Sequence, residues 1–244
     1  MIELIHLVKK FGELMAVNDL SLNVAGGELF VLLGPNAAGK TTTLKILAGL
    51  MRPTSGAARI SGIDIQTDPL AARRRMAFVP DFPFLYDKLS PNEFFRFTSQ
   101  LFRMEEGTAA IRCRQLAERF NLEPYLHKTI ETLSHGTRQR IAIVSALLHD
   151  PEVLILDEPM VGLDPQHVRV VKDILKERAL AGMTVMISTH QLSVAEEMAD
   201  RIGIMHQGRL IALGTAEQLR AESGNAGKLE QVFLALTSPE RPVE

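Results

Sequence analysis

An apolar run passes directly into a glycine-bearing loop in the segment Phe30-Val31-Leu32-Leu33-Gly34-Pro35-Asn36-Ala37-Ala38-Gly39-Lys40-Thr41. The run has the length of a buried strand, and the residues from Thr41 to Leu50 favour a helix. Residues 34–41 fit the pattern G-x-x-x-x-G-K-[ST], which is meaningful when it joins a strand to a helix. Backbone N–H groups and a helix N-terminus then face an anion. The segment therefore predicts a polyphosphate-binding loop in an α/β fold.

Two side chains of this loop have predicted roles. Lys40 would place its positive charge on the β and γ phosphates, and the Thr41 hydroxyl can ligand Mg²⁺. The alternative, a strand–turn–helix loop that contains glycines by chance, is disfavoured because both flanks are correct.

A second apolar strand is predicted at residues 153–156, and it ends in the carboxylates Asp157 and Glu158. If this strand lies beside the phosphate loop, Asp157 comes near the Mg²⁺ and Glu158 can polarise an attacking water. His190 follows the next predicted strand, so it is expected at the same edge of the sheet. The alternatives are a strand end capped by solvated acids and a structural histidine, the commoner role for a lone histidine.

The rest of the chain alternates in the manner of a parallel α/β sheet. Short strands are predicted at residues 3–8, 20–24 and 56–60, and a mostly helical block at about 91–150. Further elements follow: helix 166–181, strand 184–188, helix 191–199, strand 202–206 and, after the turn Gln207-Gly208, strand 209–213. This order predicts one α/β domain with a helical insertion.

Composition excludes several classes of protein. The chain of 244 residues carries 27 Lys+Arg and 29 Asp+Glu, a balance that gives no electrostatic case for binding nucleic acid. A single cysteine, Cys113, excludes an internal disulfide framework and fits a reducing compartment. No apolar run reaches the 18–20 or so residues that span a bilayer, and no secretory signal is visible. We therefore expect a soluble cytoplasmic chain, whose work at any membrane would need another, spanning chain.

A further motif, Leu133-Ser134-His135-Gly136-Thr137-Arg138-Gln139-Arg140, precedes a predicted helix. Ser134 is a candidate N-cap, and the small Gly136 leaves backbone N–H groups open to an anion. With the phosphate loop before it and Asp157-Glu158 after it, the chain resembles the nucleotide-binding domain of ATP-binding cassette (ABC) transporters. The resemblance covers about residues 1–215.

This resemblance implies a P-loop NTPase fold with a RecA-like parallel-sheet core, an N-terminal antiparallel β subdomain and a helical signature subdomain. One nucleotide-binding domain would cover residues 1–238, with its helical insertion at about 85–150 and a short flexible tail at 239–244. The cofactors would be ATP and Mg²⁺, and the enzyme an ATPase.

The resemblance also assigns the site residues. Residues 153–158 look like the Walker B strand, with Glu158 as the catalytic glutamate, and His190 looks like the switch histidine. Residues 162–164 look like the D-loop, which touches the opposite subunit. The metal would be held by Thr41, Asp81 and Asp157. ATP would be bound by the Walker A residues, an adenine-stacking aromatic and the signature, namely Phe11, Gly34, Pro35, Asn36, Ala37, Ala38, Gly39, Lys40, Thr41, Thr42, Ser134 and Gly136. Burial statistics alone favour Phe11 as a core residue.

Three departures from the family pattern affect function. Asp81 stands where the Q-loop glutamine is usual, and we expect it to keep a metal-sensing role with altered Mg²⁺ and pH dependence. Ala37 replaces a glycine, which is tolerable only if the backbone there avoids the left-handed region. His135 and Thr137 stand where the usual signature LSGGQ has glycine and glutamine.

In this family the signature of one subunit closes over the ATP of its partner, so a second ATPase subunit, identical or not, is implied. A separately encoded membrane permease is also implied, held at residues 81–104 by Phe82, Phe84, Leu85 and Tyr86. These four residues could equally be core. Residues 229–237 resemble the closing helix of exporter ATPases, so export from the inner face of the membrane is expected.

Three other readings remain open. A single-cassette ATPase of iron–sulfur assembly fits the same motifs, whereas ribosome and DNA ABC ATPases differ in carrying two cassettes or long coiled coils. A non-hydrolytic ATP switch is a rival from a different class. A P-loop kinase would not explain the motif at 133–140.

Overall fold

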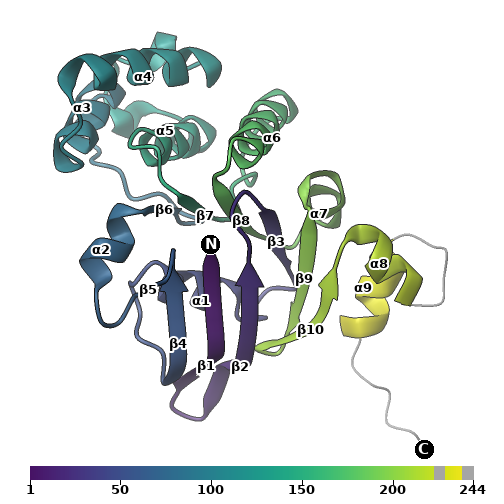
Figure 1. Cartoon of the computed structure of the whole chain (residues 1–244). Coiled ribbons are helices and arrows are strands. Elements are labelled where there is room, and N and C mark those ends of the chain that lie inside the picture. The colour runs from purple at the N-terminus through teal and green to yellow at the C-terminus, as the bar shows by residue number, and fades with distance from the viewer. Residues whose placement is uncertain (223–228, 238–244) are drawn as a thin grey trace, which may run out of the picture.

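The computed structural model describes residues 1–222 and 229–237, and two β-sheets organise it (Figure 1). The larger sheet has the strand order β10-β9-β3-β8-β7-β6. All its neighbouring strands run parallel except β10, which pairs antiparallel with β9 at one edge. Its strands are β3 (Leu29–Leu33), β6 (Met76–Val79), β7 (Val153–Asp157), β8 (Thr184–Thr189), β9 (Arg201–His206) and β10 (Arg209–Gly214).

The smaller sheet is antiparallel and has the order β2-β1-β4-β5. Its strands are β1 (Ile2–Phe11), β2 (Leu14–Val24), β4 (Ser55–Ile60) and β5 (Ile63–Asp64). It packs with α1 (Lys40–Leu47) against one face of the larger sheet, while helices cover the other face. Phe30 and Leu32 of β3 belong to the hydrophobic core between the larger sheet and the smaller sheet with α1. Leu29, Val31 and Leu33 belong to the core between the larger sheet and the helices on its other face. Burial on both faces is the reason that this strand is apolar throughout.

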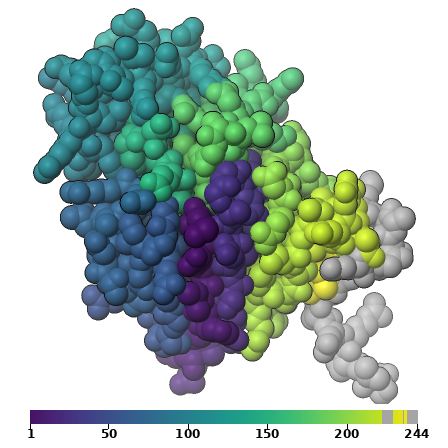
Figure 2. Space-filling model, viewed as in Figure 1, coloured from purple at the N-terminus to yellow at the C-terminus, as the bar shows by residue number. Residues whose placement is uncertain are grey.

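Three helices gather at one end of the molecule, coloured teal in Figures 1 and 2. They are α3 (Pro91–Leu101), α4 (Glu106–Arg119) and α5 (His135–Leu147), joined through 3-10 turns at Glu123–Tyr125 and Ile130–Thr132. These elements form the helical block that the sequence predicts. The N-cap prediction is also confirmed, because the Ser134 hydroxyl accepts a hydrogen bond from the Thr137 N–H at 3.3 Å and α5 begins at the next residue.

The remaining helices flank the two sheets. They are α2 (Pro69–Arg74), α6 (Pro165–Leu180), α7 (Leu192–Met198), α8 (Ala216–Glu222) and α9 (Leu229–Thr237). Among the described residues, none of these helices combines the length and the apolar character needed to cross a bilayer. The predicted tail at 239–244 lies outside the described residues.

The strand order corrects one expectation. The strand that ends in Asp157 does not lie beside the phosphate-loop strand, because β8 pairs with both β3 and β7 and separates them. The carboxyl end of β8 therefore lies between the carboxyl ends of β3 and β7.

Candidate functional site

The phosphate loop follows β3 and ends where α1 begins at Lys40. The Lys40 ammonium group is buried and donates to two carbonyls of its own loop, Gly34 O at 2.8 Å and Pro35 O at 3.0 Å. Gly39 has φ of 102°, and a Cβ there would lie 2.3 Å from the Ala16 carbonyl oxygen. The loop is thus closed around Lys40, and its backbone lies against β2.

Ala37 departs from expectation. Its φ is 62°, so the prediction that this position avoids the left-handed region is wrong. A residue with a Cβ costs roughly 1–2 kcal/mol in this conformation. The side chain is exposed, so the surrounding packing does not oppose it. The loop keeps its turn geometry, and the alanine carries the strain.

The turn between β9 and β10 is hydrogen-bonded to the phosphate loop. Gly208 N–H donates to Ala38 O at 2.9 Å, and Asn18 N–H donates to Gly208 O at 2.8 Å. This turn therefore joins the phosphate loop to β2. The sequence predicts the turn at Gln207-Gly208 but not its role, because no local pattern shows what a turn contacts.

Asp157 lies at the end of β7 with no solvent exposure. Its Oδ1 accepts a hydrogen bond from the Ser188 hydroxyl of β8, while its Oδ2 is buried and has no hydrogen-bond partner in the structure. A buried carboxylate oxygen left unpaired is costly, so this atom is suited to pair with a cation or a water that binds there.

Glu158 joins the ends of three segments. Its Oε1 lies 2.9 Å from His190 Nδ1 and 4.0 Å from Lys40 Nζ, and its Oε2 accepts from the Thr189 hydroxyl at 3.2 Å. The residue has φ of 48°, and its backbone N–H donates to Ser188 O. A non-glycine residue held in this region costs free energy and is often found at functional sites. The carboxylate is mostly buried, with 16% of its side chain exposed.

Burial is the main influence on the charge of Lys40. Desolvation lowers the pKa of Lys40 from its usual range, and the nearby carboxylates of Glu158 and Asp157 oppose that shift without reversing it. The structure thus brings Lys40, Asp157, Glu158 and His190 into one polar cluster at the carboxyl ends of β3, β7 and β8.

The signature residues lie elsewhere. Ser134, His135 and Gly136 line a cavity of about 330 Å³ together with residues 162–164 and Arg140. The described part of the chain shows no hydrogen bond or ion pair between this cavity and the phosphate loop. Asp164 N-caps α6, accepting from His167 N–H at 3.1 Å, which fixes the loop at 162–164 over the signature.

Two further predicted residues are exposed and stand apart from the cluster. Asp81 follows β6, and its Oδ1 accepts from the Phe82 N–H at 2.9 Å. Phe11 ends β1 with 46% of its surface exposed, and Lys9 Nζ lies 5.0 Å from its ring centroid. The core interpretation of Phe11 is therefore wrong, and its ring is free to stack on a planar group.

The sequence model of a family described as ABC transporter matches residues 17–161. The chain belongs to the ABC transporter family. A relative from Escherichia coli (strain K12), "Probable multidrug ABC transporter ATP-binding protein YbhF", is 36% identical over 239 residues. The match covers 96% of this chain and 41% of YbhF, so the chain spans about two fifths of that relative's length.

Solved structures agree with the family. One described as the ATP-binding subunit of an ABC transporter has a TM-score of 0.92 at 32% identity, over 97% of this chain and 99% of that chain. A dimeric post-hydrolysis state of an ATP-binding cassette, bound to ADP and Pi, has a TM-score of 0.80 at 28% identity, over 88% and 98% of the chains. The chain is therefore an ABC ATPase cassette with the P-loop NTPase fold.

Proposed function

We propose that this ABC cassette hydrolyses ATP through the cluster at the ends of β3, β7 and β8. The observation that carries the proposal is Glu158, whose carboxylate lies 2.9 Å from His190 Nδ1 and 4.0 Å from Lys40 Nζ. When ATP binds, Lys40 can exchange its loop carbonyls for phosphate oxygens. Glu158, held by His190 and Thr189, then orients and polarises the water that attacks the γ-phosphorus, and ADP and phosphate leave.

The residues at this site fit Mg²⁺, which neutralises phosphate charge when bound. Mg²⁺ in phosphate sites takes few protein ligands and keeps several waters. The described residues accordingly hold no cluster of three or more acidic, histidine or cysteine side chains arranged for a metal. The unpaired Oδ2 of Asp157 and the partly buried Thr41 are the oxygen donors beside the phosphate loop, and Asp81 is a further carboxylate that a bound ion could recruit.

The active state is a head-to-tail pair of cassettes. Ser134 and Gly136 lie in a cavity apart from the phosphate loop of their own chain, so in this arrangement they serve nucleotide bound to a second subunit. The N-terminus of α5, which begins at His135 in this cavity, is suited to a phosphate. ATP bound between the two cassettes then stabilises the closed pair through its contacts with both subunits. Hydrolysis removes the contacts of the γ-phosphate, and the pair opens.

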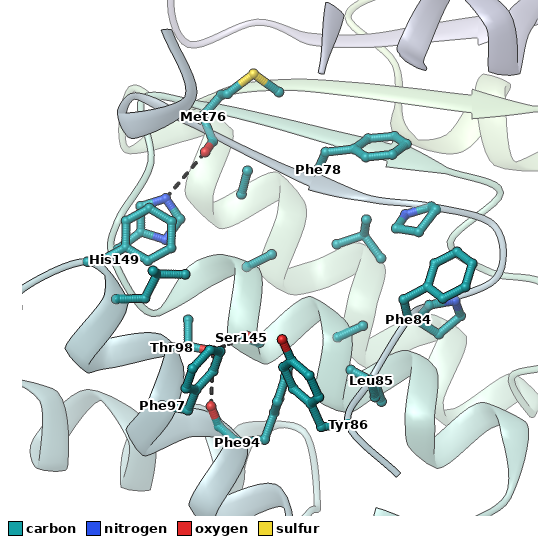
Figure 3. Close-up of a pocket in the computed structure, with 18 residues that line it drawn as sticks. Met76, Phe78, Phe84, Leu85, Tyr86, Phe94, Phe97, Thr98, Ser145 and His149 are labelled. Carbon is teal, nitrogen blue, oxygen red and sulfur yellow. Dashed lines mark hydrogen bonds between the residues drawn. The ribbon is translucent and has the colours of Figure 1, made fainter. Parts of the chain in front are cut away.

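A membrane permease docks in an apolar groove between β6 and the helices α3 and α5. The groove encloses about 570 Å³. Phe84 and Leu85 lie toward the end opposite His149, and Tyr86 lies beside Phe94 and Phe97 (Figure 3). Phe84 is 90% exposed, which is unusual for a large apolar side chain that has no partner to cover it. Phe82 does not line this groove, contrary to expectation, because its ring turns toward His135.

Export is the direction that the similarity to a multidrug transporter subunit favours, and the permease would hold the cassette on the inner face of the membrane. The single domain predicted at residues 1–238 is part of the same proposal. The transported substrate is expected to contact the permease, not the cassette.

The test compares the wild-type chain with Glu158→Gln in steady-state hydrolysis and in light scattering with ATP and Mg²⁺. Loss of the general base should lower hydrolysis by roughly 10²–10⁴-fold and let an ATP-bound pair accumulate. Glu152→Gln is the matched control, since Glu152 is an exposed glutamate just before the same strand, paired with Arg75. Equal hydrolysis by Glu158→Gln and wild type would refute the proposed role of Glu158. A variant that binds ATP and stays monomeric would refute the pair.

A further inference from the structure

The imidazole of His135 lies between two loops that are far apart in sequence. On one side, its ring centroid is 5.9 Å from that of Phe82, with the planes tilted by 32°. On the other side it lies directly on Gly162, where an added Cβ would come within 2.4 Å of His135 Cδ2. A glycine at position 135, which the ABC signature usually has, would make neither contact.

The signature and the loop at 162–164 fit closely together. A Cβ on Gly136 would lie 2.7 Å from the Gly162 carbonyl oxygen, so the two backbones are in contact. Gly162 itself has φ of 77° and is covered by the His135 ring. The exposed His135 ring thus rests on this loop, and a displacement of the ring removes its contact with Gly162.

The other neighbour of His135 leads to the groove. Phe82 is followed by Pro83, Phe84, Leu85 and Tyr86, all of which line the cavity between β6 and α3. The rings of Phe82 and His135 are close enough to pack on one another, so a shift of either ring changes the surroundings of the other. Phe82 is 61% exposed, so water covers much of its side chain. Its contact with the signature is the His135 ring.

We propose that His135 is a positioning residue that couples the groove segment 82–86 to the loop at 162–164. Occupancy of the groove and closure of the cassette pair then bias one another through the position of this one ring. The inference rests on the proposed function, since the loop at 162–164 and the signature face the second cassette there. Coupling of this kind is reciprocal, so ATP-driven pairing must also change the groove.

The experiment uses that reciprocity and needs only the cassette. The chain has no tryptophan, so Phe84→Trp places a single fluorescent reporter in the groove. The reference protein carries Phe84→Trp with Glu158→Gln, and ATP with Mg²⁺ is added while emission and light scattering are followed together. Pairing and the groove response are then measured on one sample.

Adding His135→Gly should preserve pairing and reduce the ATP-induced emission change at least fivefold. Phe82→Leu removes the same ring contact and should reduce the emission change equally. The protein that carries both His135→Gly and Phe82→Leu should show no further reduction. Phe82→Tyr keeps a ring and should retain the response. His127→Gly is the matched control, as His127 is an exposed histidine of the same helical region.

A full emission change in a paired His135→Gly or Phe82→Leu protein would overturn the coupling, and so would a reference protein that pairs without any change in emission. If His135→Gly prevents pairing, Phe82→Leu alone decides, because Phe82 lies outside the signature. A reference protein that binds ATP and stays monomeric would instead count against the proposed function, which keeps the two failures distinct.

Discussion

The two halves of this cassette's functional surface are built differently. Around the phosphate loop, Lys40, Asp157 and Glu158 are buried or nearly so, and hydrogen bonds to Gly34, Ser188 and His190 hold them. Around the groove and signature, the aromatic side chains of Phe82, Phe84 and Tyr86 are exposed, and Phe82 and Tyr86 contact other rings. The first half is formed within one chain, while the second leaves its large side chains for other molecules to cover.

This difference follows from what each half binds. A small polyanion is held by charge and by converging N–H groups, which must be fixed in advance because the ligand cannot shape them. A protein partner brings its own apolar surface, and burial of that surface supplies the free energy of association. Substitutions in the two halves should therefore differ in which measurement they change.

The largest expected effect concerns the phosphate half. Lys40→Ala removes the buried cation of the loop and should weaken ATP binding on the order of 100-fold, as loss of a charged hydrogen bond worth about 3 kcal/mol predicts. Isothermal titration calorimetry measures the ATP affinity of the variant and the wild type. Lys45→Ala, in the last turn of the same helix, is the control and should leave affinity within a factor of two or so. Equal affinities for the two variants would mean that the loop binds ATP through its backbone alone.

Asp81→Gln tests whether the two halves communicate through the metal. Asp81 belongs to the exposed half, and under the proposed function its carboxylate would add negative charge near Mg²⁺ in the closed pair of cassettes. Removing that charge should raise the Mg²⁺ concentration for half-maximal hydrolysis by roughly two- to fivefold, which corresponds to the free energy of a weak ion pair, up to about 1 kcal/mol. Asp173→Asn, an exposed aspartate on α6, is the control. An unchanged Mg²⁺ titration of Asp81→Gln would remove Asp81 from the metal site.

The smallest expected effect is on stability, and it tests whether the phosphate loop is strained at Ala37. Ala37→Gly removes the strain of a left-handed backbone at a residue with a Cβ. The greater freedom of glycine in the unfolded chain offsets part of this gain, so the free energy of unfolding should rise by about 0.5–1 kcal/mol. The melting temperature should rise by about 2 °C. Ala110→Gly, at an exposed position within α4, should change stability in the opposite direction. If both variants were destabilised, the strain at Ala37 would be excluded.

Much of the phosphate half could be predicted from sequence because its signals are local. An apolar strand, a glycine-bearing loop and a strand ending in two acids each lie within about ten residues, and the structure places Lys40, Glu158 and His190 together. What failed depends on contacts distant in sequence. The insertion of β8 between β3 and β7, and the turn of Phe82 toward His135, are decided by packing between segments.

The contacts of Lys40 with its own loop have a consequence for nucleotide binding. Because the carbonyl oxygens of Gly34 and Pro35 already accept hydrogen bonds from the Lys40 ammonium group, the loop is preorganised. The ammonium group exchanges one set of oxygen acceptors for another when phosphate arrives. The conformational entropy of ordering the loop is lost during folding, so little of it opposes binding. ATP binding to this cassette should then be limited by the rate of encounter, which leaves any slow step to follow binding.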